Sequence, residues 1–228
     1  MPAWGGPEGT VTEAPELRRP LATRQARWAH QLAAWVAGTG VSPNQISVLS
    51  LFFAAGSGAA LLWAPQFHPS QRGLLFFLAA AGIQLRLLCN MLDGMVAVEC
   101  AQRSKTGEVF NDLPDRLADS MILISLGYAV GTLPHAVELG WLAGLLATMT
   151  AYVRLLGGTC GAGQSFMGPM AKQHRMALTT AALLGAAALG PWGLAERLLY
   201  GALVVLCVGT LLTVVRRTRR VLKVLEER

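Results

Sequence analysis

The sequence is poor in charge. Only 14% of its 228 residues are Asp, Glu, Lys or Arg, whereas 53% are hydrophobic and the mean hydropathy is +0.45. Soluble domains are typically about 25% charged, so this chain has too few charges to cover the surface of a water-soluble globule of its length. A soluble enzyme, a disordered tail and a coiled coil are therefore poor fits. The composition indicates a polytopic membrane protein.

Cysteine and histidine are also scarce. The four cysteines form no Cys-x-x-Cys pair and there are only four His, which argues against a disulfide framework or a zinc site. The net charge of +6 comes without the interleaved aromatic and basic residues typical of nucleic-acid-binding proteins, so no nucleic-acid partner is expected. The first thirty residues are Arg-rich without an apolar core, and no signal peptide is expected.

Long apolar segments predict an all-α protein with six membrane-spanning helices. A span needs about 20 apolar residues, and such segments lie at about 45–64, 74–97, 117–134, 139–156, 176–193 and 198–215. With both termini in the cytoplasm, the cytoplasmic side would hold 16 of the 19 Lys and Arg residues, as the positive-inside rule favours. We therefore expect one six-helix membrane domain over 41–215, followed by a basic cytoplasmic tail over 216–228.

The cytoplasmic N-terminal segment, 1–40, predicts an amphipathic helix at the membrane interface. Leu17, Leu21, Trp28, Leu32 and Trp35 fall on one helical stripe, and most of the neighbouring arginines lie off it. Such a helix is typical of an interfacial segment on an anionic lipid leaflet. A disordered basic arm is the alternative.

Polar residues within the second predicted span are the first candidates for function, because ionisable groups inside a span are costly. Asn90, Asp93 and Ala97 share one helix face, and Arg86 lies on that face one turn earlier. Gly94 would let backbone or a phosphate approach closely.

A second polar stripe begins before the third predicted span. Asn111, Asp115 and Asp119 follow one another at four-residue steps, so they share a helix face. Gly107, like Gly94, would allow a close approach of backbone or phosphate. Two such oxygen-bearing stripes on facing helices could surround a hard divalent cation.

The two stripes resemble the signature of the CDP-alcohol phosphatidyltransferases, D-x2-D-G-x2-A-R-x8-G-x3-D-x3-D. Five of its eight positions match with every spacing intact: Asp93, Gly94, Ala97, Gly107 and Asp115. Asn90 and Asn111 stand at the first and third Asp, and Val98 stands at the Arg. The segment 41–47, which includes Asn44, also resembles the family's entry to its first span. The resemblance covers roughly residues 40–215.

The resemblance implies a phospholipid-synthesising membrane transferase that uses Mg²⁺ or Mn²⁺. It would move a phosphatidyl group from CDP-diacylglycerol to a small alcohol and release CMP. It would be a homodimer in the cell (inner) membrane, with its site facing the cytoplasm. The implied base is Asp115. The implied metal ligands are Asn90, Asp93, Asn111 and Asp115, and the residues implied to contact the CDP-lipid are Gly94, Ala97, Gly107 and Asn44.

The two amides have an electrostatic consequence. Replacing two of four carboxylates removes two negative charges from a two-metal site, so metal affinity should fall. Asp119 could restore a carboxylate, as could Glu99 or Asp112. The alternative for Asp119 is a charge that the N-terminal helix dipole favours.

Basic residues near the signature are candidates for binding a phosphate or the acceptor: Arg86, Arg116, Arg154, Lys172 and Arg175. Positive-inside topology alone would also explain the basic loop before Arg175. Arg86, within a span, could instead be a buried partner for Asp93.

Two other functions stay open. A homologue weakened by its two Asn residues could bind a CDP-lipid without turning it over. A small cation-coupled transporter could use Asp93 and Asp115. Transporter sites usually lie near the bilayer midplane, whereas these carboxylates are predicted near the cytoplasmic edge.

Overall fold

The computed structural model describes residues 26–99 and 106–228, and every regular element in them is helical. The α-helices are α1 (Arg27–Gly38), α2 (Pro43–Trp63), α3 (Pro69–Glu99), α4 (Gly107–Ala129), α5 (Ala136–Thr159), α6 (Lys172–Leu189) and α7 (Ala195–Glu226). Two short 3-10 helices, η2 (Ala64–Gln66) and η3 (Gly190–Trp192), follow α2 and α6. The prediction of an all-α fold is confirmed for these residues.

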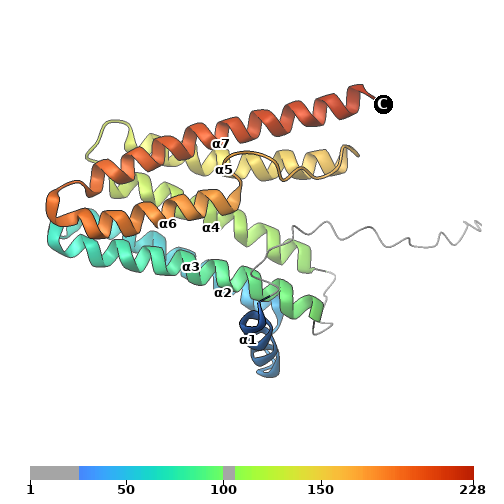
Figure 1. Ribbon diagram of the computed structural model, residues 1–228, viewed down its shortest axis with the longest axis horizontal. Helices are drawn as coiled ribbons and strands as arrows, with labels where there is room; N and C mark the ends of the chain where they lie inside the picture. Colours follow the sequence, from blue (N-terminus) through green and yellow to red (C-terminus); the bar gives the residue numbers. More distant parts are fainter. Residues whose placement is uncertain (1–25, 100–105) are drawn as a thin grey trace, which may run out of the picture.

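Helices α2 to α7 form one elongated bundle, and α1 crosses its end (Figure 1). Helix α2 packs on α3 and α4, α5 packs on α4 and α7, and α6 packs on α3 and α7. Successive helices of the bundle run in opposite directions, so each end of the bundle gathers the starts of some helices and the ends of others. Helices α2, α4 and α6 begin at the end where α3 and α5 finish, and this is the end that carries the polar stripes.

Four helical segments are long and apolar enough to cross a membrane: Pro43–Gln66, Pro69–Ala97, Ala136–Thr159 and Ala195–Glu226. Helices α4 and α6 fall outside this group. For α4, the physical reason is the charged residues in its first half. The predicted count of six spans is therefore not confirmed and stays a prediction.

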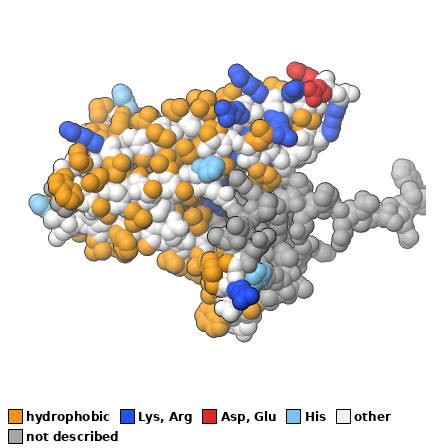
Figure 2. All heavy atoms as spheres, in the orientation of Figure 1, with side chains coloured by type: hydrophobic (Ala, Val, Ile, Leu, Met, Phe, Trp, Pro, Cys, Tyr) orange, Lys and Arg blue, Asp and Glu red, His pale blue; other side chains and the backbone are white. Residues whose placement is uncertain are grey.

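The outer surface of the bundle is apolar, as expected of a protein in lipid. Large side chains such as Phe52, Phe77, Trp141 and Val208 are more than half exposed. Figure 2 shows hydrophobic side chains over the length of the bundle on one face, with Lys and Arg gathered mainly toward the end of α7. A water-soluble protein rarely exposes apolar side chains over such a continuous surface.

Two helix boundaries differ from the sequence expectation. The third predicted span, 117–134, ends early, because α4 stops at Ala129 and a turn follows. Helix α7 continues to Glu226, so residues 216–226, predicted as a tail, form its last turns. The buried face of α7 runs through Thr210 and Thr213 to Arg217, which brings that arginine into the bundle.

Close contact between α4 and α5 depends on two glycines. A Cβ atom added at Gly127 would lie 2.8 Å from the Cα of Gly140, and one added at Gly140 would lie 2.9 Å from the Cα of Gly127. Small residues at a helix crossing let two backbones approach closely. This contact fixes α4, which carries the second polar stripe, against α5.

Helix α1 packs through small residues. Ala29 and Ala33 are fully buried in a cluster with residues of α3, whereas Trp28 and Trp35 are more than half exposed. Trp28, Leu32 and Trp35 of the predicted stripe stand on α1, whereas Leu17 and Leu21 lie outside the described residues. The interfacial helix over 1–40 stays a prediction.

Helix α2 has a well-defined start at the polar end of the bundle. The Ser42 hydroxyl accepts a hydrogen bond from the backbone N–H of Gln45, and the Gln45 side chain accepts one from the backbone N–H of Ser42. This capping box, with Pro43 in the first turn, satisfies N–H groups that a helix start leaves without acceptors. It also places Ser47 one turn into the helix, facing α3.

Candidate functional site

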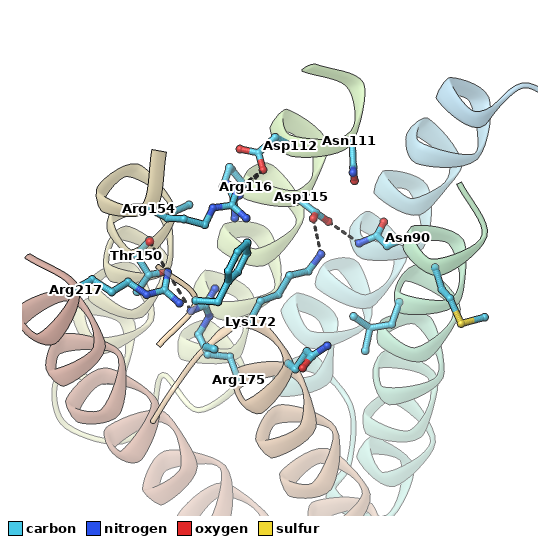
Figure 3. Close-up of a pocket in the computed structure, with 16 residues that line it drawn as sticks. Asn90, Asn111, Asp112, Asp115, Arg116, Thr150, Arg154, Lys172, Arg175 and Arg217 are labelled. Atoms are coloured by element: carbon cyan, nitrogen blue, oxygen red, sulfur yellow. Dashed lines mark hydrogen bonds and ion pairs between the residues drawn. The ribbon is translucent and has the colours of Figure 1, made fainter. Parts of the chain in front are cut away.

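A polar pocket of about 260 Å³ opens at the end of the bundle where α4 and α6 begin (Figure 3). Its walls come from α3, α4, α5, α6, α7 and the loop before α6. It is lined by Leu87, Asn90, Met91, Asn111, Asp112, Asp115, Arg116, Thr150, Ala151, Arg154, Phe166, Ala171, Lys172, Gln173, Arg175 and Arg217. Seven of these were predicted site residues: Asn90, Asn111, Asp115, Arg116, Arg154, Lys172 and Arg175.

Asp115 lies at the centre of this polar network. Its Oδ1 accepts hydrogen bonds from Asn90 Nδ2 and from Arg86 Nη2, the latter at 3.1 Å. Its Oδ2 forms an ion pair with Lys172 Nζ. Figure 3 shows the Lys172 and Asn90 side chains pointing at this carboxylate from α6 and α3. Both oxygens of Asp115 are thus engaged, and the carboxylate is only 13% exposed.

Asp119 is buried one turn deeper on α4, between two arginines. Its Oδ1 lies 2.7 Å from Arg86 Nη2 and its Oδ2 lies 2.8 Å from Arg175 Nη2. All three side chains are at most 2% exposed. The metal role predicted for Asp119 would therefore require one of these arginines to move.

The alternative that Arg86 pairs with Asp93 is wrong, because among the described residues Arg86 forms its ion pairs with Asp115 and Asp119. Both acids stand on α4, one helical turn apart. One cation from α3 thus bridges two successive turns of the second polar stripe.

Asp93 is buried beside α2 and does not line the pocket. Its Oδ2 accepts a 2.6 Å hydrogen bond from the Ser47 hydroxyl, whereas its Oδ1 is buried without a hydrogen-bond partner among the described residues. The predicted lipid contacts Gly94, Ala97, Gly107 and Asn44 also lie outside the pocket lining. The Asn44 amide instead donates to Thr106 Oγ1 at 3.4 Å.

The far side of the pocket is basic. Asp112 accepts from Arg116 and, at 2.7 Å, from Arg154, and the Arg154 guanidinium lies 5.4 Å from the centre of the Phe166 ring. Arg217 donates to the carbonyl oxygen of Thr150 at 2.6 Å. The pocket lining holds five basic side chains and two acidic ones, so its field favours an anionic ligand.

Sequence reasoning missed several lining residues, notably Thr150, Phe166 and Arg217. Arg217 falls in the segment predicted as a basic cytoplasmic tail. Its spacing from Thr210 and Thr213 places it on their helix face, and this was the signal available. Thr150 and Phe166 stand in segments whose sequence gave no such signal.

The donor chemistry suits a divalent cation only in part. The described residues contain no group of three or more His, Cys, Asp or Glu that could hold a metal. They do supply hard oxygen donors of the kind Mg²⁺ and Mn²⁺ prefer, from Asn90, Asp93, Asn111 and Asp115. The buried Oδ1 of Asp93, which finds no hydrogen-bond partner in the described part of the chain, fits such an ion. With two carboxylates among four donors, the set suits one cation better than two.

Known structures share this fold. Phosphatidylinositol phosphate synthase of Mycobacterium tuberculosis in complex with manganese and citrate matches with a TM-score of 0.71 and 18% identity, over 85% of this chain and 88% of that chain. The same protein with CDP-DAG bound matches with a TM-score of 0.69 and 20% identity, over 86% and 94%. At this identity the similarity concerns the fold.

Sequence relatives point to the membrane. No protein-family model matches the chain. The inner membrane protein YnbA of Escherichia coli is 27% identical over 162 residues, 71% of either chain. The bifunctional IPC transferase and DIPP synthase of Rubrobacter xylanophilus is 35% identical over 117 residues, 51% of this chain but only 24% of that protein. Together with the apolar helices, these similarities identify a multi-pass membrane protein.

Proposed function

We propose that the protein transfers a phosphatidyl group from CDP-diacylglycerol to a small alcohol and releases CMP. The observation that carries this is the convergence of Asn90, Asn111 and Asp115, from both halves of the signature, on one basic pocket. The fold shared with a synthase solved with CDP-DAG bound supports it, as does the relative named as an IPC transferase.

In the proposed reaction, the acceptor hydroxyl attacks the phosphorus that carries the diacylglycerol. A new P–O bond forms, the bond to the CMP oxygen breaks, and CMP leaves with the electron pair. Asp115 takes the hydroxyl proton, since it lines the pocket and its carboxylate is held in place by donors from α3 and α6. General-base catalysis of this kind typically contributes about 10²–10⁴-fold.

Charge neutralisation is the second requirement, because an anionic phosphodiester repels a nucleophile. A bound Mg²⁺ or Mn²⁺ supplies Lewis-acid polarisation of phosphoryl oxygens. Asn90, Asp93, Asn111 and Asp115 would hold it. Asp119 is the weakest candidate ligand, because two arginines already occupy its oxygens.

The remaining parts of the proposal concern binding and location. Gly94, Ala97, Gly107 and Asn44 would contact the CDP-lipid at the edge of the pocket. Arg116 and Arg154, with the nearby Lys172 and Arg175, favour an acceptor that carries an anionic group such as a phosphate. The protein would act as a homodimer in the cell membrane, with both termini and the pocket at the cytoplasmic face.

The test is CMP release by the purified protein in proteoliposomes. The vesicles contain CDP-diacylglycerol, with Mg²⁺ or Mn²⁺ and a panel of free and phosphorylated alcohols outside. We expect release that one acceptor stimulates and that Asp93→Ala and Asp115→Ala abolish. Glu138→Ala is the matched control, because this exposed acid lies at the start of α5, away from the pocket.

The same assay separates the alternatives. CDP-lipid binding without release, for any acceptor or metal, would identify a homologue weakened by its two Asn residues. Neither release nor binding would refute the transferase and return attention to cation transport. The position of the pocket at one end of the bundle argues against transport, since transporter sites usually lie near the midplane.

A further inference from the structure

A lysine stands where its charge is unfavourable without an anion. Lys172 is the first residue of α6, and the N-terminus of a helix carries a partial positive charge that disfavours cations. The first N–H groups of a helix also have no acceptor within it, and no side chain caps α6. Ala171, Lys172 and Gln173 all line the pocket, so these donors and this charge border the same space.

Asp115 compensates Lys172 only in part. Its carboxylate also interacts with Arg86, which is fully buried and keeps its charge. Arg86 is shared with Asp119, and Asp119 is in turn paired with Arg175. Three cations therefore surround two carboxylates, and Lys172 is the only one of the three with an appreciably exposed side chain, 27%. Its ammonium has three N–H donors on a flexible side chain, so it can turn toward a further anion that enters the pocket.

The number of carboxylates at the signature positions also favours an anion-binding role for Lys172. The family pattern that this chain resembles has four carboxylates, enough to balance two divalent cations. Here Asn90 and Asn111 leave two carboxylates, Asp93 and Asp115, and Lys172 contacts the second of these. A second divalent ion would have fewer negative charges to bind. At Asp115 Oδ2 it would also compete with the Lys172 ammonium.

We propose that Lys172, together with the uncapped N-terminus of α6, binds the pyrophosphate of the CDP-linked substrate and takes the place of one of two divalent cations. This rests on the proposed function, because it specifies how that site holds its donor. On binding, the ammonium turns from Asp115 Oδ2 toward a phosphate oxygen. That movement leaves Oδ2 available to take the proton of the acceptor hydroxyl.

Binding of cytidine 5′-diphosphate to the full-length protein in lipid nanodiscs tests the proposal without turnover. Calorimetry in EDTA should detect binding by the wild type, and Lys172→Met should weaken it about tenfold or more, as loss of a charge-assisted hydrogen bond does. Lys172→Arg, which keeps the charge, should restore most of it. Lys223→Met is the matched control, because Lys223 is 75% exposed near the end of α7.

A count of bound Mn²⁺ by electron paramagnetic resonance, with cytidine 5′-diphosphate present, gives a second readout. We expect one ion per protein in the wild type. Two ions, or equal nucleotide binding by wild type and a folded Lys172→Met protein, would overturn the proposal. Nucleotide binding that needs Mn²⁺ would overturn it while leaving the transferase intact. Absence of binding with or without Mn²⁺ would overturn both.

Discussion

The buried ion pairs of Asp119 lead to a prediction about stability. Asp119→Asn removes the carboxylate that lies between Arg86 and Arg175 but keeps the size of the side chain. Arg86 retains Asp115 as a partner. Arg175 keeps hydrogen bonds to the Thr150 hydroxyl and to a backbone carbonyl, but it loses Asp119, its ion-pair partner among the described residues.

The magnitude follows from burial. Removing one partner of a buried pair typically costs about 3–5 kcal/mol, because the other charge stays buried without compensation. For a chain of this length each kcal/mol corresponds to roughly 2–4 °C in melting temperature. We therefore expect Asp119→Asn to lower the melting temperature by roughly 6–20 °C.

The assay is thermal unfolding in detergent micelles, followed by circular dichroism. Asp112→Asn is the control, since Asp112 also pairs with two arginines but its side chain is 36% exposed, and solvent screening makes the pairs of a partly exposed carboxylate weaker than those of a fully buried one. A drop for Asp119→Asn no larger than the drop for Asp112→Asn would refute the reasoning. Replacing Asp119 and Arg175 together by apolar residues should recover part of the loss, because no unpaired charge then remains at Arg175.

Three further predictions concern the site and the bundle. Asp115→Asn should lower CMP release by about 10²–10⁴-fold, as loss of a general base does, with an unchanged elution volume on gel filtration; release within a factor of three of wild type would exclude Asp115 as the base. Asn90→Asp places a second carboxylate beside Asp115, so Mn²⁺ should raise its melting temperature more than that of wild type, and an equal rise would count against a metal at this position. Gly140→Leu should lower the melting temperature, because even a Cβ there lies 2.9 Å from the Cα of Gly127; an unchanged melting temperature would show that α4 and α5 are not held in this close contact.

The periodic parts of the site could be predicted from the sequence. A four-residue step is close to one helical turn, so Asn111, Asp115 and Asp119 had to share a face of α4 once that segment was helical. The match to a spaced signature then brought Asn90 on α3 to the same pocket. Both inferences use only local geometry and a known pattern, and neither needs the packing of α5, α6 or α7.

Roles within the site could not be predicted in the same way. Asp93 fits the signature better than Asn90, yet Asn90 lines the pocket and Asp93 is buried against Ser47. The two positions differ by three residues, about 60° around the helix, and the approach of α2 decides which of them faces a cavity. Arg217 shows the same limit, since a basic residue near a chain end is equally compatible with lipid headgroups and with a pocket.

The sequence by itself determined that the chain forms apolar helices for a membrane and that one end of the bundle carries two oxygen-bearing stripes. Composition and periodicity are local properties, and they suffice for that. Only the tertiary structure decided the partner of each charge, because Arg86, Lys172 and Arg175 reach the acids of α4 from helices about 30 to 60 residues away in the sequence. A charge is neutralised by whatever lies within a few ångströms of it, and packing alone sets those neighbours.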